Sequence, residues 1–201
     1  MKRAINFNAG PAAIPLEVLE QAQTEMLDWK GTGMSVMEVS HRGKEYDEMH
    51  HNAMKSFREI AGMDESWKIL FCTGGASTQF AMLPMNFLTK EKTADYLSTG
   101  HWSKAAVKEA KRYGNIHIAA DTEANGVFTR IPEQKEIQLS ASAEYVHYTS
   151  NNTIFGTQWQ YWPDLGKAPA VCDMSSDIFS RPFPADKFSM IYAGAQKNLG
   201  P

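Results

Sequence analysis

The sequence has little of what marks secreted, membrane-spanning or metal-binding proteins. It has two cysteines in 201 residues, and Cys72 and Cys172 each stand in an apolar run, which indicates buried free thiols rather than a disulfide framework. No apolar run approaches the roughly 20 residues of a membrane span, and polar residues interrupt the N-terminus too early for a signal peptide. We therefore expect a cytoplasmic protein, because free thiols suit a reducing compartment.

The net charge gives no reason to expect an acidic partner. There are 20 Lys and Arg against 23 Asp and Glu, a net charge of −3, and the basic residues form no stripe, so neither nucleic acid nor a membrane surface is expected as partner. Metal catalysis is not expected either, since the adjacent His50 and His51 face different sides of a helix and the other histidines are dispersed. The 43% of hydrophobic residues allow a large domain with a sizeable core.

Apolar runs alternate with helical patterns along most of the chain. Residues 6–15, rich in turn formers, predict an irregular arm, so we expect an arm over 1–15 and a domain over 16–201. Such alternation is typical of an α/β domain with a mostly parallel sheet between helices. The patterns predict helices over 15–31, 44–60, 76–88 and 102–113, and strands over 68–73, 94–98, 115–120, 145–149, 170–173 and 189–193.

Ligands bind at the carboxyl ends of strands in open α/β sheets, so the residues after each apolar run are candidates for a site. Gly74 and Gly75 precede a helix whose first backbone N–H groups, with the Ser77 hydroxyl, can hold a phosphate; a plain turn with a helix cap is the alternative. Trp102 can stack on an aromatic ligand or can serve as a lid on the core. The short polar side chains of residues 150–153, Thr153 among them, can bond a polar ring substituent or can belong to a turn.

Two charged residues complete this set. Asp173 leaves an apolar strand, where a carboxylate needs a partner such as a protonated pyridine nitrogen; a helix cap or a salt bridge is the alternative. Lys197 lies among small residues that leave room for a bulky adduct, and a lysine in such surroundings can act as a nucleophile. A solvated surface charge is the alternative for Lys197.

Five segments together resemble one family. They are 8–12 (NAGPA), 35–43 (SVMEVSHRG), 173–177 (DMSSD), 180–182 (SRP) and 192–201 (YAGAQKNLGP). Their order and spacing resemble those of the phosphoserine aminotransferases, which are class V aminotransferases of fold type I. The resemblance extends over essentially the whole chain and implies the large domain of a pyridoxal 5′-phosphate (PLP) enzyme.

The resemblance also implies a role for each matching residue. Lys197 would hold PLP as a Schiff base and move the proton between carbon atoms, and Asp173 would pair with the pyridine nitrogen. Trp102 would stack on the ring, and Thr153 would bond its polar edge. The full set implied for the cofactor is Ala76, Ser77, Trp102, Thr153, Asp173, Gln196 and Lys197, with Ala76, Ser77 and Gln196 at the phosphate.

The reaction implied for the family moves an amino group from L-glutamate to 3-phosphohydroxypyruvate. His41 and Arg42 would meet the substrate, and a guanidinium suits a carboxylate or phosphate because it can bond bidentately. Some relatives carry arginine at the position of Ser77, so that contact to substrate phosphate is missing here. The family also continues beyond Pro201, so we expect an incomplete large domain, no small C-terminal domain and, for the whole enzyme, a homodimer with shared active sites.

Two other interpretations stay open. Another enzyme of the same fold type, such as an alanine–glyoxylate aminotransferase, would fit the same cofactor residues. A cysteine desulfurase fits less well, since it needs a mobile cysteine and both cysteines are expected to be buried. A fragment that binds no cofactor is the non-enzymatic alternative.

Overall fold

The computed structural model describes residues 3–8 and 10–200, which divide into two compact units. One unit runs to Leu70 and takes in Gly200, and the other is Phe71–Leu199. Ala9 of the predicted arm and Pro201 of the predicted lysine motif lie outside the described residues.

The first unit is helical. Its elements are α1 (Leu16–Glu25), the 3-10 turn η1 (Trp29–Gly31) and α2 (Lys44–Ala61). Pro15 stands directly before α1, where a fixed φ and a missing N–H cost nothing. The predicted helix over 15–31 is too long, because the chain leaves the helix at Met26 and Lys30 adopts a left-handed φ of 52°. α2 ends as predicted, with Gly62 in the left-handed conformation that favours glycine.

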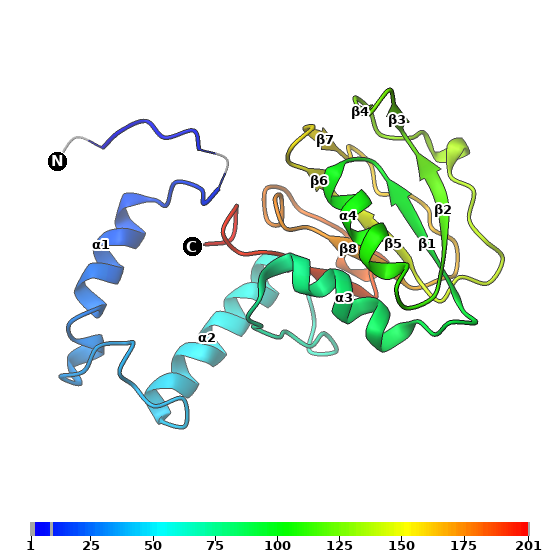
Figure 1. Ribbon diagram of the computed structural model, residues 1–201. Coiled ribbons are helices and arrows are strands. Elements are labelled where there is room, and N and C mark those ends of the chain that lie inside the picture. Colours follow the sequence, from blue (N-terminus) through cyan, green and yellow to red (C-terminus); the bar gives the residue numbers. More distant parts are fainter. Residues whose placement is uncertain (1–2, 9, 201) are drawn as a thin grey trace. The chain divides into compact units, whose positions relative to one another are not determined.

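The second unit is built on a five-stranded sheet in the order β2-β1-β5-β8-β9 (Figure 1). All four neighbouring pairs are parallel, which agrees with the predicted α/β class. The strands of this sheet are β1 (Thr93–Ser98), β2 (Asn115–Asp121), β5 (Val146–Thr149), β8 (Ala170–Asp173) and β9 (Met190–Tyr192). Two short antiparallel hairpins, β3 (Glu123–Ala124) with β4 (Val127–Phe128) and β6 (Asn151–Asn152) with β7 (Thr157–Gln158), follow β2 and β5.

The two faces of the sheet are covered differently. Helices α3 (Gly75–Phe87) and α4 (His101–Ala110) pack on one face, where Phe80 and Leu83 join Tyr96 and Val171 in a buried cluster. On the other face the Tyr148 ring contacts Trp159 and Phe188, which lie on irregular chain. The 3-10 turns η2 (Gln134–Glu136) and η3 (Ala185–Lys187) also belong to this irregular chain.

The prediction of a strand over 68–73 is wrong for this structure. These residues have no strand assignment and pair with none of the five strands, and Leu70 and Phe71 are 80% and 53% exposed. An apolar run becomes a strand only when a neighbour completes its backbone hydrogen bonds, and here none does. Cys72 is consequently exposed, which corrects its predicted burial, whereas Cys172 in β8 is buried as expected.

The parallel register aligns the carboxyl ends of three strands. Thr149 is paired with Asp173 and Asp173 with Tyr192, so β5, β8 and β9 end level with one another. β1 lies beside β5 and points the same way. The segments that leave these four strands therefore begin at a single edge of the sheet.

Candidate active site

Four of the predicted site residues come from neighbouring strand ends. Trp102 follows β1, Thr153 follows β5 and β6, Asp173 ends β8, and Lys197, with Gln196 beside it, follows β9. β1, β5, β8 and β9 are consecutive in the sheet. The segments that carry these residues thus leave a single edge of the sheet, which is where the sequence analysis expected a site.

Helix α3 directs its N-terminus toward this edge. In the first half of α3, the Phe80 ring lies 6.3 Å from the ring of Tyr192 at the carboxyl end of β9. Just after its end, Leu88 packs against Gly114, which precedes the amino end of β2. α3 therefore runs antiparallel to the strands, and Ala76 in its first turn lies at the carboxyl edge.

The first turn of α3 is open to a ligand. Gly74 stands at the N-cap with φ 99° and can offer no side-chain cap, so the first N–H groups of the helix lack the capping acceptor that many helices have. Ala76 is half-buried and Ser77 is exposed. An anion at this position would receive backbone N–H groups, the helix dipole and a hydroxyl.

The N-terminus of α4 is closed by contrast. The Asn152 side-chain Oδ1 accepts hydrogen bonds from the backbone N–H groups of Trp102, at 3.1 Å, and Ser103, at 3.2 Å. These donors are already satisfied, so α4 is not the anion site. It presents the half-buried indole of Trp102 instead.

Asp173 is a buried carboxylate, only 2% exposed. Its Oδ1 accepts hydrogen bonds from the Ser175 backbone N–H, at 2.9 Å, and from the Ser175 hydroxyl. Burial raises the pKa of Asp173 to about 6, the two Ser175 hydrogen bonds lower it, and the charge of Asp177 raises it. A buried acid with this balance is suited to a cationic partner, because such a partner stabilises the charged form.

The loop that carries Lys197 is tied to the segment that follows Asp173. The Gly194 N–H donates to the Ser175 hydroxyl oxygen at 3.0 Å, and the Asn198 side chain donates to the Ile178 carbonyl at 2.7 Å. The Met174 N–H donates to the Tyr192 carbonyl at 2.9 Å just before this loop. Lys197 is half-buried between these two attachments.

The sequence predicted no site role for Ser175 or Asn198, and it indicated Asn152 only as one of four polar residues after a predicted strand. Ser175 stands two residues after Asp173, the spacing at which a carboxylate accepts from a following N–H or hydroxyl, so a signal was present. The partners of Asn152 and Asn198 lie about 50 and 20 residues away in the chain. No local sequence pattern predicts such contacts.

His41 and Arg42 lie in the other unit. They occupy the turn before α2, both are exposed, and the Arg42 N–H donates to the Ser40 hydroxyl at 3.2 Å. Because they belong to a separate unit, His41 and Arg42 are not placed with the residues at the sheet edge.

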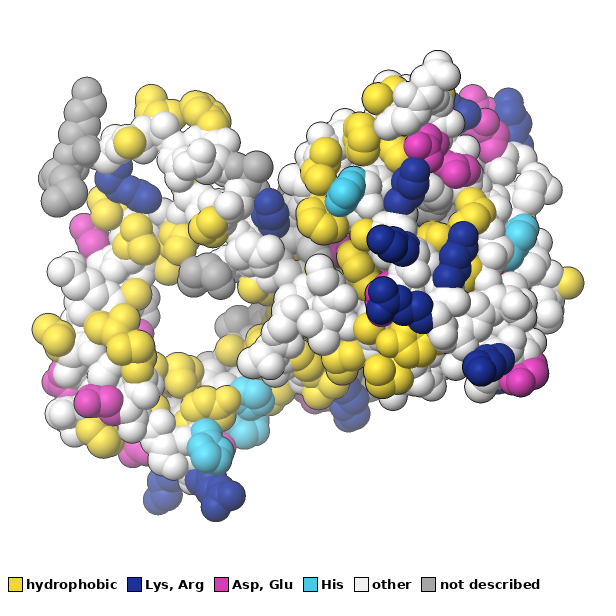
Figure 2. All heavy atoms as spheres, in the orientation of Figure 1, with side chains coloured by type: hydrophobic (Ala, Val, Ile, Leu, Met, Phe, Trp, Pro, Cys, Tyr) yellow, Lys and Arg dark blue, Asp and Glu magenta, His cyan; other side chains and the backbone are white. Residues whose placement is uncertain are grey.

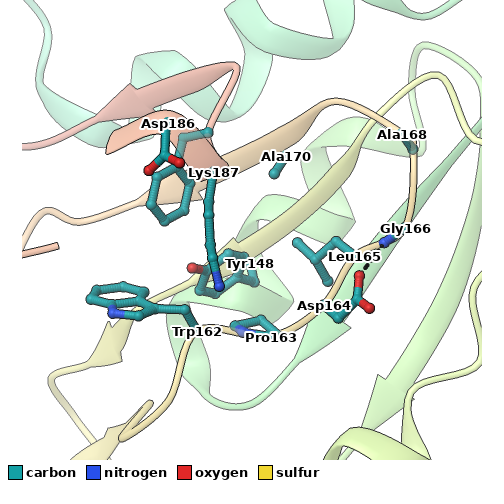
Figure 3. Close-up of a pocket in the computed structure, with 11 residues that line it drawn as sticks. Tyr148, Trp162, Pro163, Asp164, Leu165, Gly166, Ala168, Ala170, Asp186 and Lys187 are labelled. Atoms are coloured by element: carbon teal, nitrogen blue, oxygen red, sulfur yellow. Dashed lines mark hydrogen bonds between the residues drawn. The ribbon is translucent and has the colours of Figure 1, made fainter. Parts of the chain in front are cut away.

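A cavity of about 430 Å³ lies elsewhere in the second unit (Figure 3). It includes Ala170, the first residue of β8, and therefore lies toward the amino ends of the strands. Tyr148, Trp162 and Lys187 lie on its wall, and none of the predicted site residues does. This cavity is separate from the candidate active site.

Neither a metal-binding group nor a membrane-spanning helix is found among the described residues. Over 3–8 and 10–200 there is no group of three or more His, Cys, Asp or Glu side chains that could hold a metal ion. No helix in the same part of the chain is both long and apolar enough to cross a membrane.

The family model for aminotransferase class V matches residues 4–201. The chain belongs to the aminotransferase class-V family. The phosphoserine aminotransferase of Halalkalibacterium halodurans is 56% identical over 201 residues, which are 100% of this chain and 55% of the relative. The chain therefore spans about half the length of the curated relatives it matches.

Solved structures agree with this membership. The phosphoserine aminotransferase of Bacillus circulans subsp. alkalophilus is 55% identical, with a TM-score of 0.94 over 99% of this chain and 55% of that one. The PLP-bound phosphoserine aminotransferase of Trichomonas vaginalis is 44% identical, with a TM-score of 0.91 over 99% of this chain and 56% of that one. The predicted family and fold class are confirmed, as is PLP as the cofactor of the family.

Proposed function

We propose that this chain forms the cofactor-holding part of a phosphoserine aminotransferase. The reaction would transfer the amino group of L-glutamate to 3-phosphohydroxypyruvate, giving O-phospho-L-serine and 2-oxoglutarate in L-serine biosynthesis. The observation that carries the proposal is the convergence of Trp102, Thr153, Asp173 and Lys197 on one sheet edge beside the open N-terminus of α3. The 51–56% identity to proteins named phosphoserine aminotransferase supports this choice of substrates.

The residues at this edge fit PLP. Asp173 is buried, accepts hydrogen bonds from Ser175 and has a pKa raised to about 6, so a protonated pyridine nitrogen would supply a positive charge to stabilise the carboxylate. The α3 N-terminus, with Ala76 and Ser77, would hold the phosphate, and Gln196 would assist. PLP, when bound, supplies an electron sink that stabilises negative charge at the substrate carbon.

The remaining side chains have distinct roles in the proposal. Lys197 would bind the cofactor covalently. Once the substrate amine has displaced it, its free amine would carry a proton to and from the substrate carbon. Trp102 would stack on the ring and exclude water from one face, and Thr153 would orient the ring through its polar edge. His41 and Arg42 would bind the substrate, Arg42 through paired hydrogen bonds to a carboxylate or phosphate.

The chemistry can be tested on the full-length protein that contains this chain. The purified protein should show a visible absorbance band, and borohydride reduction should fix the cofactor mass on Lys197, as read by peptide mass spectrometry. Lys197→Ala should abolish both the covalent mass and the activity. Finding the adduct on another lysine, or no adduct, would contradict the proposal.

The choice of substrate needs its own test. A panel of amino acceptors should favour 3-phosphohydroxypyruvate over glyoxylate and pyruvate by at least about tenfold in kcat/KM, since a phosphate adds charge-assisted hydrogen bonds. Equal rates would favour the alternative of another fold type I aminotransferase, such as an alanine–glyoxylate enzyme.

We also propose a domain organisation and an assembly. Residues 1–15 would form an arm, and residues 16–201 would belong to the PLP-binding large domain. The whole enzyme would be a cytoplasmic homodimer with shared active sites. Exposed apolar residues of α3 support a second copy: Met82, Met85 and Phe87 are 38%, 61% and 56% exposed. Figure 2 shows hydrophobic side chains gathered on the surface of the second unit. Both cysteines being free supports a reducing compartment.

A further inference from the structure

One buried side chain joins two of the loops at the candidate site. Asn152 is 0% exposed and stands next to Thr153, in the hairpin β6–β7. Its Oδ1 accepts from the backbone N–H groups of Trp102 and Ser103, and its Nδ2 donates to the Thr99 hydroxyl at 3.0 Å. The side chain thus makes three hydrogen bonds, one to the segment between β1 and α4 and two to the first turn of α4.

The Asn152 side chain packs closely against Gly100. A Cβ at Gly100 would lie 2.3–2.5 Å from three atoms of the Asn152 side chain, so only glycine fits at that position. Gly100 has an extended φ of 169°, which any residue can adopt. Asn152, and not the backbone conformation, therefore excludes a side chain at position 100.

The surrounding hydrogen bonds hold the same two loops. The Thr157 hydroxyl donates to the Thr99 carbonyl at 2.6 Å, and the Gly156 N–H donates to the Asn152 carbonyl at 2.8 Å. The Ser103 hydroxyl accepts from the N–H groups of Thr99 and Gly100, both at 2.9 Å. The Asn152 side chain caps the N-terminus of α4 as an N-cap residue would, although Asn152 lies about 50 residues further along the chain.

We propose that Asn152 is a positioning residue, which fixes the Trp102 backbone against the loop carrying Thr153 and so sets the ring-stacking surface for the cofactor. This inference rests on the proposed function. Asn152 touches no reacting group in the proposal. It acts through Trp102, whose backbone N–H it holds, and through Thr153, its neighbour in the chain.

The Oδ1 and Nδ2 atoms of Asn152 bond different partners, so substitutions can remove their hydrogen bonds separately. Asn152→Ala removes all three hydrogen bonds and leaves two N–H groups of α4 unsatisfied. Asn152→Asp keeps an acceptor for those N–H groups at a helix N-terminus that favours negative charge. Thr99→Val removes only the partner of Nδ2 and keeps the side-chain shape. Asn151→Ala is the matched control, because the neighbouring amide bonds Ser176 instead.

The experiment uses the full-length protein and PLP itself as the probe. We expect Asn152→Ala to weaken PLP binding at least tenfold and to lose most of the circular dichroism induced in the cofactor band. Asn152→Asp should restore affinity to within about threefold of wild type, and Thr99→Val should weaken it about threefold. Asn151→Ala should leave the affinity and the cofactor band unchanged.

A double-mutant cycle separates positioning from general stability. If Asn152 acts through Trp102, then Asn152→Ala in a Trp102→Ala background should change PLP affinity less than about twofold, because the surface that it positions is gone. An unchanged tenfold effect in that background would overturn the inference. So would a variant that unfolds at lower temperature yet keeps wild-type PLP affinity and dichroism.

The outcomes also separate this inference from the function on which it rests. A wild-type protein that binds no PLP would overturn both. A wild-type protein that binds PLP, beside an Asn152→Ala variant of equal affinity, would overturn the role of Asn152 alone. Should Asn152→Ala fail to fold, Thr99→Val decides, since loss of one hydroxyl that leaves PLP affinity unchanged would contradict the proposed role.

Discussion

The Ser175 hydroxyl donates a hydrogen bond to the Asp173 carboxylate and accepts one from the Gly194 N–H at 3.0 Å. One hydroxyl therefore connects the buried acid at the end of β8 with the loop that carries Lys197. The side chains proposed for the two ends of the cofactor ring are held through a shared contact. Movement of either loop would change the hydrogen bonding, and hence the pKa, of Asp173.

Replacing Ser175 by alanine should raise the pKa of Asp173 above its present value of about 6, because the hydroxyl hydrogen bond lowers it. Loss of one hydrogen bond to a charged group should weaken PLP binding at neutral pH by about 10–100-fold. Carboxyl ¹³C NMR of the cofactor-free protein would follow the pKa, and a PLP titration would give the affinity. The matched control is Ser176→Ala, whose hydroxyl bonds Asn151; equal effects of the two changes would refute the assignment.

Burial of Asp173 should make the cofactor-free protein less stable as the pH rises. The folded-state pKa of about 6 lies above the ordinary 3.8, so the unfolded chain loses this proton first and stability falls between about pH 4 and 6. Asp173→Asn keeps an acceptor for Ser175 and removes the buried charge. The variant should match wild type below pH 4 and exceed it by about 3 kcal/mol above pH 6.

Urea unfolding of both cofactor-free proteins at several pH values would measure this difference. A constant offset between the two proteins across that range would show that Asp173 does not titrate in the folded state as described. Bound PLP should reverse the order at pH 7.5, since the carboxylate then has a cationic partner whose charge the neutral amide cannot balance.

Local patterns predicted most helices and strands, and two of these predictions failed. The apolar run at 68–73 has strand composition, yet its backbone finds no partner strand, and Leu70 and Phe71 remain exposed. α1 ends before the glycines at 31 and 33 that were expected to end it, and the following segment folds back so that the Val36 N–H donates to the Glu25 carbonyl at 3.3 Å. Strand formation depends on neighbours distant in sequence, which no window along the chain contains.

The residues of the candidate site also differ in whether the sequence alone predicts their role. Asp173, Trp102 and Lys197 could be found in the sequence because each follows an apolar run that becomes a strand. The contacts of Asn152 could only be found in the structure, since its hydrogen bonds reach back about 50 residues. Residues that touch a ligand lie in recognisable places, whereas residues that position them depend on the packing of loops.

Gly114 should tolerate no side chain. A Cβ there would lie 2.4 Å from the Thr89 carbonyl oxygen and 2.5 Å from the Leu88 Cγ, so the turn between α4 and β2 would have to shift. Gly114→Ala should lower the free energy of unfolding by about 1–3 kcal/mol. Lys108→Ala, on the exposed side of α4, should change it by less than about 0.5 kcal/mol. Urea unfolding compares them, and equal stability of the two variants would refute the close packing.

His147 should make the protein sensitive to acid. It is 0% exposed in β5, its Nε2 lies 2.8 Å from the Tyr192 hydroxyl, and its Nδ1 has no partner among the described residues. Burial lowers the pKa of His147 from 6.5 to about 3. Between these values the unfolded chain binds a proton that the folded chain does not, so stability falls as the pH drops below 6.5. His147→Gln keeps a hydrogen-bonding group for Tyr192 but cannot titrate.

Wild type should therefore lose about 3 kcal/mol more stability than His147→Gln between pH 7.5 and 4. The measurement is urea unfolding of the cofactor-free proteins, with both made in an Asp173→Asn background because Asp173 titrates with the opposite sign in part of the same range. Gln138→Ala serves as a control, since its side chain bonds the Lys135 carbonyl on an exposed turn. Parallel stability profiles with and without the His147→Gln change would mean that the buried imidazole accepts a proton without opening the fold.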